Sequence, residues 1–218
     1  MKKLFLIVLI AICSMQQGEA QLKQLKVSAN KRFFQTADGK PFFWLGDTGW
    51  LLFKKCTREE ALLYLDDRQR KGYNVIQVMV VHDINDAVNV YGDSSIHNKD
   101  VSKPVLNDEH IVDDMKYGFW DHVDYIIREA EKRGIYMALV PVWGGNIKKV
   151  NPEQARIYAT FLAHRYKKFS NIIWLNGGDI KGSDGLDSWN MIGKTIRSID
   201  KKHLIGFHPR GRNSSSTW

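Results

Sequence analysis

The stretch IIWLNGGD, residues 172–179, runs from a block of apolar residues directly into two glycines and a carboxylate. The apolar block predicts a strand that is buried on both faces. The Asn-Gly-Gly that follows predicts a change of chain direction where the strand ends, and glycines would let a ligand approach the backbone closely. A strand in the core would therefore hold Asp179 at a fixed place beside a glycine-floored loop.

The same pattern recurs along the chain, with amphipathic helices between the apolar strands. Helix signals include the capping box that Thr57 and Glu60 form, and Asn151-Pro152 at the start of a later helix. Strands that alternate with helices predict a parallel sheet covered by helices. The expected strands are NVIQVMVV at 74–81, IYMALVPVWGG at 135–145, NIIWLNGGD at 171–179 and LIGFHPRG from 204, ending near Pro209. They follow a hairpin with arms at 33–34 and 42–45. The expected helices lie at 57–71, 119–130, from 152, and 186–199.

Polar and aromatic residues follow every expected strand at its carboxyl end. This distribution favours a (β/α)8 barrel, whose catalytic residues stand at that end, over an open doubly wound sheet. Neither GxGxxG nor a Walker loop occurs, so no nucleotide site and no cofactor are expected. The segments concerned are 46–50, 82–83, 143–146, 176–179 and 208–210.

The number of strand–helix units is smaller than a barrel requires. A barrel has eight strands in typically about 250 residues, whereas the sequence indicates five units, the first of which starts with the second arm of the hairpin, after its turn at Asp38-Gly39. We therefore expect residues 21–218 to be the N-terminal part of a barrel domain, with the later strands missing.

The first twenty residues have the order of a secretory signal peptide: Lys2-Lys3, an apolar run, then small residues before Gln21. The expected location is thus secreted or periplasmic. A lipid anchor on Cys13 is the alternative, which Ile12 disfavours. Cleavage would leave Cys56 as the one cysteine, so no internal disulfide is expected.

The net charge of +8 comes from Lys and Arg that are interspersed with acids. This arrangement is typical of solvated helix faces and argues against a nucleic-acid partner. No later segment is apolar enough to predict a transmembrane span.

A carboxyl such as Asp179, beside Trp143 in a partly dry cleft, could have a raised pKa and act as a general acid. Glycoside cleavage needs such an acid together with a second carboxylate, and aromatic rings suit the apolar faces of sugars. The alternative is that Asp179 merely caps the helix that follows.

The chain resembles the apiosidase-like catalytic domain, glycoside hydrolase family 140. DGKPFFWLGDTGW, NVIQVMVV, NIIWLNGGD and FHPRGRNSSSTW carry the resemblance across nearly all of the mature chain. It implies a (β/α)8 barrel, Asp179 as general acid/base, a Glu nucleophile on a later strand, and a retaining mechanism. The implied substrate is a pectin side chain of the plant cell wall, from which a terminal apiose is released. No Glu follows Asp179 in this sequence, so we expect this chain alone to be inactive.

Five further residues are candidates for binding substrate. Asp47, Trp143 and Asn176 would contact sugar, and His208 and Arg210 would contact sugar or orient Asp179. Trp50 and Trp174 are expected in the core. Two other functions stay open: a non-catalytic carbohydrate-binding remnant of the barrel, and a metal-dependent hydrolase with His82, Asp83 and His208 as ligands. The latter lacks the paired His-x-His of such sites, and we expect no metal.

Overall fold

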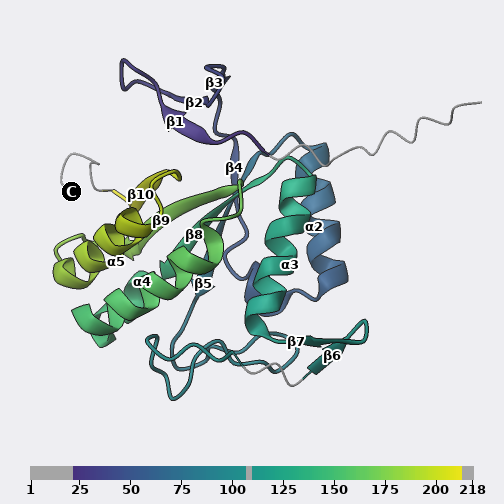
Figure 1. Cartoon of the computed structure of the whole chain (residues 1–218), viewed down its shortest axis with the longest axis vertical. Helices are drawn as coiled ribbons and strands as arrows, with labels where there is room; N and C mark the ends of the chain where they lie inside the picture. Colours follow the sequence, from purple (N-terminus) through teal and green to yellow (C-terminus); the bar gives the residue numbers. More distant parts are fainter. Residues whose placement is uncertain (1–21, 107–109, 213–218) are drawn as a thin grey trace, which may run out of the picture.

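The computed structural model describes residues 22–106 and 110–212. In this part of the chain, a parallel sheet has the strand order β10-β9-β8-β5-β4 (Figure 1). Each strand lies beside the preceding one, so the order never reverses, as in a barrel and unlike a doubly wound sheet. The strands are β4 (Gly46–Thr48), β5 (Val75–Val81), β8 (Tyr136–Val142), β9 (Ile172–Ile180) and β10 (Ile205–Pro209).

Four long helices connect these strands and pack against one face of the sheet. They are α2 (Arg58–Arg70), α3 (Phe119–Lys132), α4 (Pro152–Tyr166) and α5 (Leu186–Ile199). The expected capping box of Thr57 and Glu60 begins α2, and Asn151 caps α4 through the N–H of Gln154. The structure thus confirms the predicted fold class, a (β/α)8 barrel represented here by its first five strands.

The sheet is strongly curled. Trp50 follows β4 at one edge and His208 lies on β10 at the other edge, yet their ring centroids are 5.3 Å apart. Edge strands of a flat five-stranded sheet would be separated by about 19 Å, four spacings of about 4.8 Å. The curl therefore brings the two edges of the sheet to one site.

Side chains of the central strands β5, β8 and β9 alternate between two apolar clusters. Ile76, Leu139 and Trp174 belong to the cluster beneath the helices. Met79, Ala138 and Leu175 belong to the cluster on the concave inner face. Which cluster a residue joins decides whether it can reach the barrel interior.

The N-terminal hairpin forms, but it differs in extent from the prediction. Strands β2 (Phe34–Thr36) and β3 (Pro41–Phe42) pair antiparallel, and β1 (Leu25–Val27) adds a third strand. The second arm was expected to run to residue 45 but ends at Phe42, because Gly46–Thr48 pairs with β5 instead. Gly39 adopts φ +89° in the turn, as a glycine there permits.

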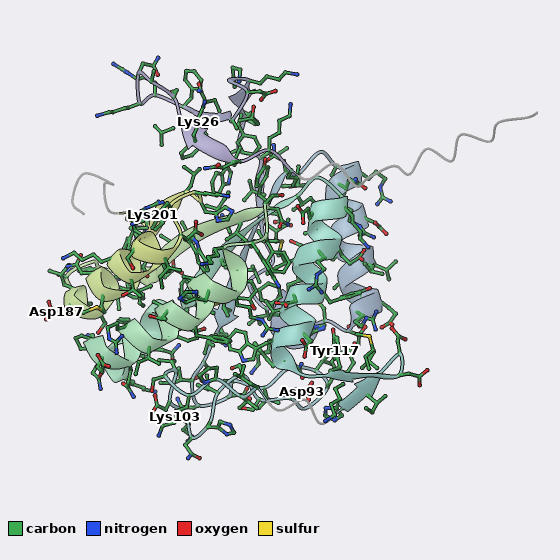
Figure 2. All side chains as sticks on the ribbon, viewed as in Figure 1. Lys26, Asp93, Lys103, Tyr117, Asp187 and Lys201 are labelled. Atoms are coloured by element: carbon green, nitrogen blue, oxygen red, sulfur yellow. The ribbon has the colours of Figure 1, made fainter. Side chains whose placement is uncertain are left out.

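Besides β1, four short elements escaped the sequence-based prediction, because none is long enough to show an apolar period. They are α1 (Leu52–Lys55), the hairpin β6 (His110–Val112) and β7 (Met115–Tyr117), and the 3-10 helix η1 (Gly144–Lys149). Figure 2 shows Lys103, in the segment between β5 and α3, at the opposite end of the molecule from Lys26 on β1.

The expected signal peptide, residues 1–20, and Cys13 within it lie outside the described residues. None of the described helices is long and apolar enough to cross a membrane. Cys56 is a free thiol, and burial raises its pKa.

Candidate active site

A bulge in β9 places Asp179. His208 of β10 pairs with Gly177, whereas the next residue, Pro209, pairs with Ile180. Gly178 and Asp179 are therefore extra residues in β9, and bulges of this kind re-aim side chains next to active sites. Gly177, Gly178 and Asp179 all adopt positive φ, at +99°, +125° and +49°.

The two glycines are needed by the protein's own packing. A Cβ on Gly178 would lie 2.6 Å from Cε3 of Trp143, and one on Gly177 would lie 2.4 Å from the carbonyl oxygen of His208. Gly144 meets Gly178 in the same way, because a Cβ on Gly144 would lie 2.0 Å from the carbonyl oxygen of Gly178. The sequence suggested that a ligand approaches the backbone at these glycines. In the structure, Trp143, Gly144 and His208 of the neighbouring segments occupy that space.

Asp179 faces solvent at this bulge, with its side chain 64% exposed. Its Oδ1 lies 3.2 Å from Nε2 of His208. A cavity of about 400 Å³ is lined by Asp179, Arg210, Gly211 and Arg212. The structure therefore brings Asp179, His208 and Arg210 together as predicted. Asp179 was expected to be partly buried, but among the described residues it is mostly exposed.

Three rings, Trp50, Trp143 and His208, pack together beside Asp179 and are called the aromatic trio below. Trp50 and Trp143 have ring centroids 5.2 Å apart, and Trp143 and His208 have centroids 5.8 Å apart. The sequence pointed to Trp143 and His208, whereas Trp50 was expected in the core. The place of Trp50 in the aromatic trio follows from the curl of the sheet, for which the sequence carries no local signal.

Asn176 lies on the other face of β9, which corrects its predicted place in the site. It is only 7% exposed, and its Nδ2 donates to the carbonyl oxygen of Trp189 on α5 at 2.9 Å. Alternation along the strand forces this, because Asn176 shares a face with Trp174 under the helices. Asn176 lines a groove of about 980 Å³ between α5 and β10. Figure 2 labels Asp187 in the first turn of α5 and Lys201 just beyond its last residue.

Asp47 likewise points toward the helices. Its Oδ2 accepts a hydrogen bond from the Tyr64 hydroxyl at 2.9 Å and lies 3.0 Å from Nε of Arg68. Both partners belong to α2, so Asp47 ties β4 to that helix. Burial, then the hydrogen bond to Asp47, raises the pKa of Tyr64 well above its usual value.

His82 and Asp83 act in local backbone structure. The carbonyl oxygen of His82 accepts from Nδ2 of Asn146 at 2.7 Å, and Oδ1 of Asp83 accepts from the Asn85 N–H at 2.9 Å. Within residues 22–106 and 110–212, no three His, Cys, Asp or Glu side chains gather as metal ligands would. Trp174 is in the core as expected, and its Nε1 donates to Asp200.

Solved structures share this fold at high sequence similarity. One glycoside hydrolase is 44% identical, with a TM-score of 0.81, over 90% of this chain and 43% of its own. A glycoside hydrolase family 5 protein from Bacteroides vulgatus is 43% identical, with a TM-score of 0.82, over 89% of this chain and 41% of its own. The chain thus spans less than half the length of these two structures.

An endo-1,4-β-mannanase from Rhizomucor miehei shares the fold alone, at 18% identity and a TM-score of 0.61, over 91% of this chain and 65% of its own. No curated protein matches the chain. The profile of the family described as "Apiosidase-like, catalytic domain" matches residues 28–218. The chain therefore belongs to the family of apiosidase-like catalytic domains.

Proposed function

We propose that this chain carries the acid/base half of a secreted, retaining glycoside hydrolase. One observation carries the proposal: the bulge of β9 presents Asp179 at the carboxyl end of a barrel strand, hydrogen-bonded to His208, whose ring packs against Trp143. Asp179 would protonate the leaving oxygen and then deprotonate the incoming water. Family membership and the two solved glycoside hydrolases support this reaction class.

The nucleophile of a retaining enzyme is a second carboxylate about 5–5.5 Å from the acid. No Glu follows Asp179 in this sequence, and we propose that a Glu from outside these 218 residues completes the pair. The proposed substrate is a plant cell-wall pectin side chain that loses a terminal sugar. Secretion, directed by residues 1–20, would bring the protein to such a substrate.

The test is sugar release from pectic oligosaccharides by a polypeptide that carries this chain with the rest of the barrel. Asp179→Asn should abolish release. Asp184→Asn is a matched control in the loop after β9, because Asp184 is 3.9 Å from Lys148 and outside the proposed chemistry. Equal activity of the Asp179→Asn variant and the parent would refute the proposal. Sugar binding that is unaffected by Asp179→Asn, without release, would favour the non-catalytic carbohydrate-binding alternative.

A further inference from the structure

The direction of the Asp179 carboxyl depends on His208. The bulge fixes the backbone of Asp179. The side chain is exposed, and its contact with Nε2 of His208 fixes its rotamer. That contact, at 3.2 Å, is at the long end of hydrogen-bond distances. A small displacement of the imidazole would therefore release the carboxyl.

Two indoles hold the imidazole in place. Trp50 meets the His208 ring edge-on, at an interplanar angle of 68°, and Trp143 lies against it at 37°. The two indoles also contact each other, so that each restrains the ring that the other touches. Only 25% of the His208 side chain is exposed.

Trp50 is itself fixed to the far edge of the sheet. Its carbonyl oxygen accepts from the N–H of Met79 at 3.1 Å, which links the segment after β4 to β5. Gly49 packs so tightly that a Cβ there would lie 3.0 Å from Cγ2 of Ile76. The Trp50 indole therefore reaches across the curled sheet from an immobile backbone.

We propose, on the basis of the function proposed above, that Trp50 is a positioning residue for the general acid. Its indole presses the His208 imidazole against Trp143 and so keeps Nε2 in contact with Asp179. Without the indole, the imidazole can shift and the Asp179 carboxyl can turn away from the leaving oxygen. The role is indirect, because Trp50 acts on the acid through His208.

Nitrogen-15 spectra of the His208 imidazole, assigned by their loss in His208→Gln, test this contact without needing activity. In the parent chain, Asp179→Asn should shift these signals. Trp50→Leu should also shift them, and should shrink the response to Asp179→Asn. Trp44→Leu is the matched control, because Trp44 packs against the same inner cluster but its ring partner is Phe34, 6.0 Å away.

Unchanged His208 signals in Trp50→Leu, with an undiminished response to Asp179→Asn, would overturn the proposal. If Trp50→Leu does not fold, Trp50→Phe is measured in the same way. A smaller shift in the same direction is expected, and no shift would overturn the proposal.

Kinetics of the polypeptide that contains the whole barrel provide the functional readout. Trp50→Leu should lower kcat on natural linkages about tenfold or more, since small misplacements of catalytic groups have effects of this size. KM on natural linkages should stay unchanged, and so should the rate of forming the glycosyl-enzyme from a dinitrophenyl glycoside, whose leaving group needs no acid. If the parent shows no glycosidase activity, the proposed function fails while the spectra still decide the role of Trp50.

Discussion

Replacing Gly178 by alanine tests how the NGGD segment is built. At φ +125°, a residue with a Cβ is strained by about 1–3 kcal/mol. The new methyl would also lie 2.6 Å from the Trp143 ring and 2.8 Å from the Gly144 nitrogen, and such overpacking typically costs about 1–3 kcal/mol. We therefore expect Gly178→Ala to lower the free energy of unfolding by about 4 kcal/mol.

Gly39→Ala is the matched control. Gly39 also has positive φ, +89°, but a methyl group at this position would have no atom within 4 Å beyond those of its chain neighbours. The substitution should cost about 1 kcal/mol from backbone strain alone. The loss of unfolded-chain entropy on replacing glycine is common to both variants and cancels in the comparison.

Urea unfolding followed by far-ultraviolet circular dichroism measures both variants. We expect Gly178→Ala to be the less stable by about 3 kcal/mol, which is the overpacking contribution together with the greater backbone strain at Gly178. If the two variants were equally stable to within about 0.5 kcal/mol, the ordinary spread for harmless substitutions, the close packing of β9 on Trp143 would be refuted.

Three further predictions concern charge and stability. Burial alone would raise the pKa of Asp200, but hydrogen bonds, above all from His203, hold it below its usual range. Asp200→Asn should therefore cost about 2 kcal/mol at neutral pH, a difference that starts to shrink as pH falls below about 4, where the unfolded chain takes up a proton, and is lost only below the depressed pKa of the folded state. Burial lowers the pKa of His122 to about 4, so protonation favours the unfolded chain, and about 3 kcal/mol of stability should be lost between pH 7 and pH 4. His122→Asn should remove that part of the pH dependence in urea titrations. Asp47→Asn should cost about 1 kcal/mol by weakening the tie to α2 without changing sugar affinity in calorimetry.

Each of these would be contradicted by a simple outcome. For Asp200, it is a stability difference that is as large at pH 2 as at pH 7. For His122, it is the same slope of stability against pH in the parent and the variant. For Asp47, it is a loss of sugar binding in a variant that remains folded, which would restore the place in the sugar pocket that the sequence suggested.

The sequence was most informative where one interaction within a few residues decides the structure. The capping box of Thr57 and the turn at Gly39 are of this kind, and both were predicted correctly. The alternation of strands and helices likewise predicted the barrel. The sequence also singled out Asp179, because a carboxylate after a buried strand and two glycines is unusual; its catalytic role stays a prediction.

The sequence could not predict which face of a buried strand each side chain occupies. β9 is apolar on both faces, so IIWL has no period that shows which face Asn176 joins. The same holds for Asp47 in the short β4. Trp50 was expected in the core and does pack against the inner cluster, but its contact with His208 was not foreseen, because it depends on a curl of the sheet that lets side chains at the two edges reach each other.

The role of Asp179 is tested most directly by Asp179→Ala in the polypeptide that completes the barrel, assayed on a natural linkage and on a dinitrophenyl glycoside with and without azide. We predict a loss of about 10²–10⁴-fold on the natural linkage, the usual contribution of a general acid. The loss in forming the glycosyl-enzyme from the activated glycoside should be much smaller, and azide should restore turnover by replacing the water that lacks its base. An unchanged rate on the natural linkage would contradict the proposed role of Asp179.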